Sequence, residues 1–193
     1  RRQRQMCIRD SMAPKDEQEL RDMLNTGFAY PGPALVRYPR GTGVGLELDK
    51  NLERTVALGK AEVIRSGNKL AILAFGTRAA AALQAGEALD ATVINMRFVK
   101  PLDQELLQEL TQTHQALLTV EEGVIAGGAG SAVAEYLLNQ GQIVPMRILG
   151  LPDQFIEQGD ANQWLAELGL DASGITAAGR TLLDSLARKP GHA

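Results

Sequence analysis

The chain has 193 residues and a formal net charge of -3, and 45% of its residues are hydrophobic but only 4% are aromatic. This length and apolar content suit one globular domain with part of a second attached, and they exclude a largely disordered chain. A mildly acidic chain with few aromatic side chains is not expected to bind nucleic acid, and no apolar run approaches the roughly 18 residues that a membrane span needs.

Cysteine and histidine are rare in this chain. One cysteine, Cys7, cannot form an intrachain disulfide, and His114 and His192 lie too far apart in sequence to suggest a local metal site. We therefore expect a reducing, cytoplasmic setting. Residues 1–11 hold four arginines without a helical or strand pattern, so we expect this stretch to be non-native or disordered, a basic tail being the alternative.

Residues 12–25 predict the first helix. Pro14 suits an early helical position, the acidic side chains that follow favour the positive end of the helix dipole, and apolar residues up to Leu24 recur at helical spacing. We expect Gly27 to end this helix.

Arg40 is the candidate binding residue. Residues 34–36 predict a short strand, which must end by Pro39 because proline cannot donate to a central ladder. Arg40 therefore lies at a strand end, beside a glycine-rich loop over residues 41–45. Ligands bind at strand ends in α/β sheets, and a guanidinium next to free backbone amides suits a phosphate group. Arg40 is thus a candidate phosphate ligand, and an exposed loop arginine without a ligand remains the alternative.

The next stretch, residues 49–58, is polar and without periodicity, which predicts a linker. Beyond it, residues 61–65 and 70–75 predict two strands, and the turn Ser66-Gly67-Asn68 between them favours an antiparallel hairpin. The second of these strands is continuously apolar, as expected for a strand that is covered on both faces.

The rest of the chain alternates predicted helices with predicted strands. Strands are expected over residues 92–96, 117–120 and 144–149. Helices are expected over 78–89, after an N-cap at Asp103, from Ser131, around Trp164, and over 172–187 after an N-cap at Asp171. This order predicts an α/β fold of three layers: a mostly parallel five-stranded sheet with one antiparallel edge strand, and helices on both faces.

Three features around the strand over residues 117–120 are candidates for chemistry. The glycines of residues 127–130 open a helix and could bind an anion through their amides, although close packing of helix on strand is the favoured interpretation. Glu121 and Glu122 directly follow a strand, so we expect them to point in different directions, which makes them a weak candidate for a carboxylate pair in acid–base chemistry. His114, at a helix end, is interpreted as a partner of the helix dipole rather than a base.

Several motifs together resemble one enzyme family. The chain resembles the 1-deoxy-D-xylulose-5-phosphate synthases, which contain the following segments in the same order: Val36-Arg-Tyr-Pro-Arg-Gly41, Met96-Arg-Phe-Val-Lys-Pro-Leu-Asp103, Thr119-Val-Glu-Glu122, Gly127-Gly-Ala-Gly-Ser131 and Gly150-Leu-Pro-Asp153. The resemblance runs from Met12 to about Ala187 and covers the carboxy-terminal third of such an enzyme. It divides the chain into the tail of a pyrimidine-binding middle domain (12–48), a linker (49–59) and a transketolase-like C-terminal domain (60–189).

The resemblance implies a homodimeric transferase that uses thiamine diphosphate and Mg²⁺ to condense pyruvate with D-glyceraldehyde 3-phosphate, with release of CO₂. Its product would feed isoprenoid, thiamine and pyridoxal synthesis. The second arginine of the RYPRG motif, Arg40, would hold the phosphate of the aldehyde, whereas Arg37 would be structural. The family's cofactor motifs lie upstream of the matching residues, so we expect the chain by itself to bind no cofactor and to be inactive.

Two other interpretations stay open from the sequence. One is a stand-alone dimerisation or ligand-binding module like the C-terminal domain of the transketolase group. The other is part of a 2-oxoacid dehydrogenase beta subunit, which the RYPRG and GLPD segments disfavour.

Overall fold

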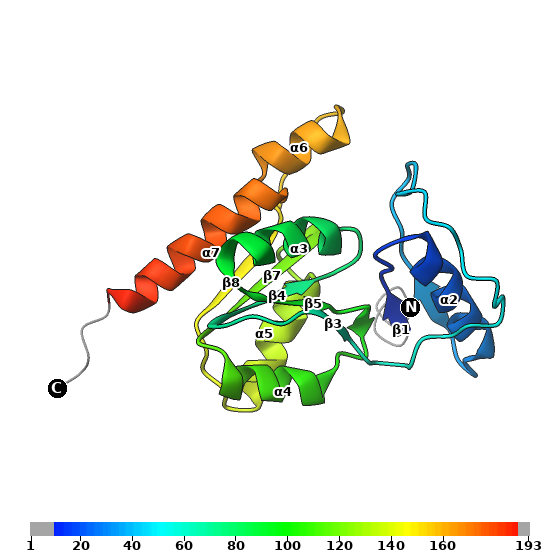
Figure 1. Ribbon diagram of the computed structural model, residues 1–193, viewed down its shortest axis with the longest axis horizontal. Helices are drawn as coiled ribbons and strands as arrows, with labels where there is room; N and C mark the ends of the chain where they lie inside the picture. The colour runs from blue at the N-terminus through cyan, green and yellow to red at the C-terminus, as the bar shows by residue number, and fades with distance from the viewer. Residues whose placement is uncertain (1–9, 189–193) are drawn as a thin grey trace.

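The computed structural model describes residues 10–188, which form two sheets and six helices (Figure 1). The larger sheet has five strands in the order β3-β5-β4-β7-β8, and the smaller has three in the order β2-β1-β6. The strands are β1 (Asp10–Met12), β2 (Ala34–Val36), β3 (Glu62–Arg65), β4 (Leu70–Ala74), β5 (Thr92–Asn95), β6 (Phe98–Lys100), β7 (Ala116–Val124) and β8 (Met146–Leu151). The helices are α2 (Glu17–Ala29), α3 (Arg78–Leu89), α4 (Gln104–Thr113), α5 (Ala129–Asn139), α6 (Ala161–Glu167) and α7 (Ala172–Ala187).

The five-stranded sheet has the predicted architecture. Strands β5, β4, β7 and β8 are parallel, and β3 runs antiparallel at one edge. The predicted hairpin is wrong, however, because β3 pairs with β5 and not with β4. A tight turn suggested that neighbours in sequence would pair. Strand β4 is instead buried at all of its residues and takes a parallel partner on each side, as continuously apolar strands do.

Helices cover both faces of this sheet, with α3 and α7 on one face and α4 and α5 on the other (Figure 1). Side chains alternate along a strand, so Ile72 packs toward α3 and α7 while Leu73 packs toward α4 and α5. The predicted caps are confirmed. The carboxylate of Asp103 accepts a hydrogen bond from the Leu106 amide (3.2 Å), and that of Asp171 accepts one from the Gly174 amide (2.8 Å).

Strands β1, β2 and β6 together with α2 form a second unit, which we call the small region. Its core contains Met12, Met23 and Phe98, all with 1% or less of their surface exposed. The sequence did not predict β6, which pairs antiparallel with β1. It also predicted no strand before Met12, but Asp10 is the first residue of β1. The expectation for residues 1–9 lies outside the described residues.

Helix α2 begins and ends later than predicted. The carboxylate of Asp16 accepts a hydrogen bond from the Glu19 amide (2.8 Å), so the helix starts after this cap rather than near Pro14. The helix also continues through Gly27, where an added Cβ would lie 3.4 Å from the Cβ of Ala34. Gly27 therefore allows α2 to pack closely on β2 instead of ending the helix.

Residues 49–56, which make up most of the predicted linker, pack along α2, and we call them the strap. Arg54 forms an ion pair with Asp22 of α2 (3.0 Å). Several strap carbonyls also accept hydrogen bonds from side chains of α2, among them Asp49 O from Arg21 (2.7 Å) and Leu52 O from Asn25 (2.7 Å). The strap contains no helix or strand, but its contacts with side chains of α2 hold its backbone in position.

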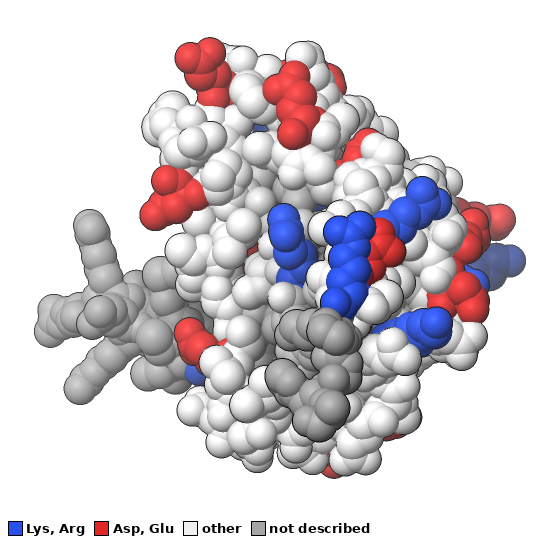
Figure 2. All heavy atoms as spheres, turned by 90° about the vertical axis from the view of Figure 1, so that its left-hand side faces the viewer, with Lys and Arg blue, Asp and Glu red and all other residues white. Residues whose placement is uncertain are grey.

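Within residues 10–188, no helix combines the length and the apolar character needed to cross a membrane. Figure 2 shows one face of the molecule, on which basic and acidic side chains are scattered among mostly uncharged ones.

Candidate functional site

A pocket of about 210 Å³ lies where the carboxyl ends of strands from both sheets meet. Residues that follow β1, β2 and β4 line it, together with the end of β7 and part of β6. This is the edge at which parallel α/β sheets bind their ligands. The lining residues are Ala13, Pro14, Arg37, Tyr38, Pro39, Phe75, Gly76, Thr77, Val99, Glu121 and Glu122.

Glu121 faces helix α5. Strand β7 is longer than predicted and runs to Val124, so this glutamate lies within the strand. The residue is 3% exposed, and its carboxylate accepts a hydrogen bond from the Gly130 amide (2.8 Å) in the first turn of α5. The chain's own carboxylate therefore occupies an amide that could otherwise hold an external anion. An added Cβ at Gly130 would lie 2.6 Å from Ile148 Cγ2, which supports the packing interpretation of this glycine loop.

Glu122 faces the other side of the sheet, toward helix α3. Its Oε1 accepts a hydrogen bond from the Thr77 hydroxyl (2.5 Å) and forms an ion pair with Arg78 Nε (2.7 Å). The two consecutive glutamates thus point in opposite directions, as predicted, and each has its own partners. They anchor one helix on each face of the sheet and do not form a carboxylate pair for acid–base chemistry.

Arg37 lines the pocket, whereas Arg40 is not among the lining residues and lies exposed in the following loop. The Arg37 amide donates to Met12 O (2.8 Å), which continues the pairing of β2 with β1 and holds Arg37 at the pocket edge. No ion pair or side-chain hydrogen bond joins its guanidinium to any residue between 10 and 188. The sequence did not place Arg37 in a pocket, because β1, whose pairing with β2 positions it, lies partly in the stretch that was set aside.

The remaining predicted residues lie away from the pocket. His114 Nε2 is 2.8 Å from the hydroxyl of Thr92, the first residue of β5, so this histidine lies at the opposite edge of the sheet. Burial lowers the pKa of His114 below its ordinary value. The Ser131 hydroxyl donates to Ile125 O (2.5 Å), and Trp164 lies half-buried on α6. None of these side chains can act as a base on a ligand in the pocket.

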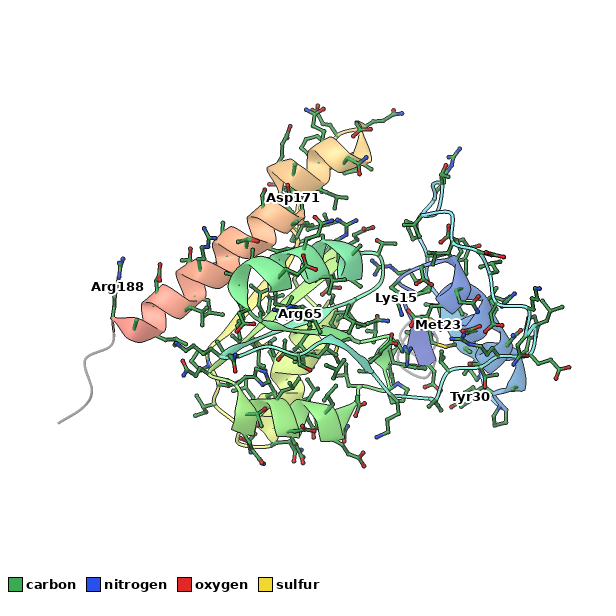
Figure 3. The ribbon with its side chains drawn as sticks, viewed as in Figure 1. Lys15, Met23, Tyr30, Arg65, Asp171 and Arg188 are labelled. Carbon is green, nitrogen blue, oxygen red and sulfur yellow. The ribbon has the colours of Figure 1, made fainter. Side chains whose placement is uncertain are left out.

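A cluster of charged side chains joins the small region to the five-stranded sheet. We call this group, Lys15, Glu19, Glu62, Asn95 and Arg97, the seam cluster. Figure 3 shows Lys15 at the junction of the two units. Burial disfavours its charge, but Glu62 and Glu19 outweigh that effect and raise the pKa of Lys15. Burial opposes ionisation of Glu62 as well, yet Lys15 and Arg97 lower the pKa of Glu62.

The family model of the transketolase C-terminal domain matches residues 59–175, which is more than half of the chain. The chain belongs to this family. Relatives named 1-deoxy-D-xylulose-5-phosphate synthase include proteins of Thioalkalivibrio sulfidiphilus, 55% identical over 181 residues, and Bordetella petrii, 58% identical over 163 residues. These matches cover 94% and 84% of this chain but only 28% and 26% of the relatives, so the chain spans less than a third of their length.

Solved structures agree with the transketolase C-terminal domain assignment. A structure described as "Split gene transketolase, inactive beta4 tetramer" has a TM-score of 0.80 and 30% identity, covering 91% of this chain and 57% of its own. Transketolase from Leishmania mexicana has a TM-score of 0.66 over 98% of this chain and 27% of its own. Because the identity is only 16%, this match shows that the two proteins share a fold and nothing more.

The transketolase C-terminal domain described here does not itself fit a thiamine diphosphate and Mg²⁺ site. Among residues 10–188, no group of three or more His, Cys, Asp or Glu side chains is arranged to hold a metal ion. Mg²⁺ bound to a diphosphate needs carboxylate or carbonyl oxygens, and the two glutamates at the pocket already have partners within the chain.

Proposed function

We propose that this chain is the carboxy-terminal part of a 1-deoxy-D-xylulose-5-phosphate synthase, a homodimeric enzyme of the cytoplasm. The observation that carries the proposal is 55% identity over 181 residues to a protein of that name. Other relatives of the same name are 50–58% identical. The order of the RYPRG, MRFVKPLD and GLPD segments supports the same conclusion.

The complete enzyme would condense pyruvate with D-glyceraldehyde 3-phosphate and release CO₂, at the start of a route to isoprenoids, thiamine and pyridoxal. Thiamine diphosphate would supply the carbanion chemistry, with Mg²⁺ on its diphosphate. Parts of the enzyme other than this chain would hold both groups, because the described residues offer no fitting site. The chain alone is therefore expected to be inactive.

Within the complete enzyme, we propose that an arginine of the RYPRG segment holds the phosphate of the aldehyde substrate. Arg40 is the candidate from the sequence. Arg37 is a second candidate, favoured by its place in the pocket and by a guanidinium without a described partner. A free guanidinium can form two parallel hydrogen bonds to a phosphate, which makes either arginine chemically suitable.

Kinetics of the complete synthase separate the two arginines. If Arg40 holds the phosphate, Arg40→Ala raises the KM for D-glyceraldehyde 3-phosphate about 30-fold, because a charge-assisted bidentate contact is lost, and changes the KM for pyruvate far less. Arg37→Ala is the matched variant, from the same segment. A large effect at Arg37 alone would transfer the role to Arg37, and equal effects on both substrates would remove both arginines from it.

Calorimetry tests whether the cofactor site lies outside this chain. Residues 1–193 titrated with thiamine diphosphate and Mg²⁺ should show no binding, since no group of three or more His, Cys, Asp or Glu side chains among the described residues could hold the metal ion. Micromolar binding to this chain alone would contradict the proposal.

A second arrangement is favoured by one comparison. The solved structure with a TM-score of 0.80 is a split-gene transketolase, described as an inactive tetramer. By analogy, this chain would be a separate subunit that works only with a chain carrying the cofactor domains. Adding such a chain to purified residues 1–193 would restore activity in that case, whereas a single continuous synthase needs no second polypeptide.

A further inference from the structure

Glu19 of α2 is a buried carboxylate with an unusual number of donors. Only 3% of its surface is exposed. Its oxygens accept hydrogen bonds from the Lys15 amide (2.8 Å), from Asn95 Nδ2 (2.8 and 3.0 Å) and from Arg97 Nε (2.7 Å). The Lys15 ammonium lies 3.6 Å away. A buried charge with this many donors is held in one position.

These donors come from segments that are separate in the chain. Lys15 belongs to the connection between β1 and α2, whereas Asn95 and Arg97 flank the junction of β5 and β6. The Ala13 amide donates to Arg97 O (2.8 Å), so the backbones of the two segments are also in contact. Glu62 of β3 completes the seam cluster, with ion pairs to Lys15 (2.7 Å) and Arg97 (3.0 Å).

The segment that Glu19 holds is one wall of the pocket. Ala13 and Pro14 line the pocket together with Gly76. An added Cβ at Gly76 would lie 3.6 Å from Ala13 Cβ and 3.7 Å from Pro14 O, so the space between Gly76 and residues 13–14 is only about as wide as one methyl group. A small displacement of residues 13–15 therefore changes the shape of the pocket.

We propose that Glu19 is a positioning residue: its carboxylate fixes residues 13–15 against the β5–β6 junction and so sets the shape of the substrate pocket. Glu19 itself does not line the pocket. The part of this inference that concerns substrate rests on the proposed function. A misplacement of about 1 Å at a site can cost roughly 100-fold in rate, so a wall held by one carboxylate is a sensitive point.

The negative charge of Glu19 is needed because its surroundings consist of donors. Asn95 is fully buried and turns its amide nitrogen toward Glu19, and Arg97 is always charged. In Glu19→Gln, one of the two acceptor oxygens becomes an NH₂ group that faces these donors. The side chain keeps its size, but it no longer holds residues 13–15 in position.

Asp22 provides a matched control on the same helix. It is 1% exposed and pairs with Arg54 of the strap (3.0 Å), and it also accepts a hydrogen bond from Gln18 (2.7 Å). Asp22→Asn therefore also removes a buried negative charge from α2. Its ion pair leads to residues 49–56, not to the pocket wall, so it reports the purely structural cost of such a change.

The test compares Glu19→Gln and Asp22→Asn in the complete synthase. Glu19→Gln should raise the KM for D-glyceraldehyde 3-phosphate about tenfold, whereas Asp22→Asn should leave it within about twofold of wild type. Glu19→Asp, which keeps the charge but shortens the side chain, should restore part of the loss. Equal effects of Glu19→Gln and Asp22→Asn, or an unchanged KM in Glu19→Gln, would overturn the proposal.

Hydrogen exchange separates this proposal from the proposed function. In Glu19→Gln, amides of residues 12–15 should exchange at least tenfold faster, and in Asp22→Asn the faster exchange should occur in residues 49–56. This readout needs no activity, so it still decides the role of Glu19 if wild type fails to condense the two substrates. Unchanged exchange over residues 12–15 in Glu19→Gln would refute the proposal that Glu19 holds this segment in position. If that variant does not fold, Glu19→Asp provides the same comparison.

Discussion

Strand β4 of the five-stranded sheet is buried along its whole length and consists of apolar residues, whereas helix α2 of the small region buries one methionine and three polar side chains. The polar ones are Glu19, Asp22 and Thr26. The large sheet thus depends on apolar burial, which has no preferred direction. The small region depends more on ion pairs and hydrogen bonds, whose geometry is specific.

The two kinds of contact therefore have different effects: apolar contacts stabilise the fold, and polar contacts determine where its parts lie. Apolar contact between sheet and helices supplies most of the driving force for folding. The buried polar contacts of α2 instead decide where the helix, the strap and the pocket wall lie, because an unpaired buried charge is costly. We expect substitutions in the large sheet to lower global stability, and those in the small region to change local geometry.

The largest expected effect is that of Ile72→Ala in β4. The side chain is fully buried in the core facing α3 and α7, so its truncation should lower the free energy of unfolding by about 4 kcal/mol through lost burial and a cavity. Urea unfolding followed by circular dichroism measures this. The control is Leu138→Ala on α5, where the leucine is 67% exposed and the loss should stay within about 0.5 kcal/mol. Similar losses in the two variants would show that β4 is not the centre of the fold.

A smaller and more local effect is expected for Met23→Ala in α2. Met23 is fully buried, but it packs in a small core with Met12 and Phe98, so we expect a loss of about 2 kcal/mol. Hydrogen exchange should become faster in residues 10–36 while the amides of β4 stay protected. If the amides of β4 lost protection to the same extent, the two units would unfold together and the comparison would fail.

The smallest effect is the pH dependence due to His114 of the large sheet. Burial lowers its pKa in the folded state, so below about pH 6.5 the unfolded chain binds more protons and the free energy of unfolding decreases. His114→Gln should reduce the drop in melting temperature between about pH 7.5 and pH 5.5. Both proteins are compared in the His192→Gln background, so that no other histidine titrates. An identical drop in both would remove His114 as its cause.

Local signals in the sequence predicted the local structure well. Helix α3 and helix α7 have the predicted bounds, and the caps Asp103 and Asp171 are confirmed, because capping depends on residues within one turn. The hairpin was wrong and β6 was missed, since strand pairing depends on partners that are distant in sequence. The residue preferences of a single strand do not indicate which other strand it pairs with.

The candidate site shows the same limit. The sequence placed Arg40 at a strand end, but pairing of β2 with β1 brings Arg37 into the pocket. That Glu121 and Glu122 point apart could be predicted from strand alternation, whereas their partners in α5 and α3 could not. The role of Glu19 could not be predicted from the sequence, because acidic residues are common in the first turn of a helix.

Strand β6 has a practical consequence for anyone who wishes to express the two units separately. Its residues, Phe98–Lys100, follow β5 in the chain but complete the sheet that begins with β1. A cut near residue 59 would leave β1 with an open edge in the first fragment and the ring of Phe98 uncovered in the second. Both pieces would then expose surfaces that promote self-association. A soluble first fragment would instead require residues 98–100 to be grafted back onto its free edge.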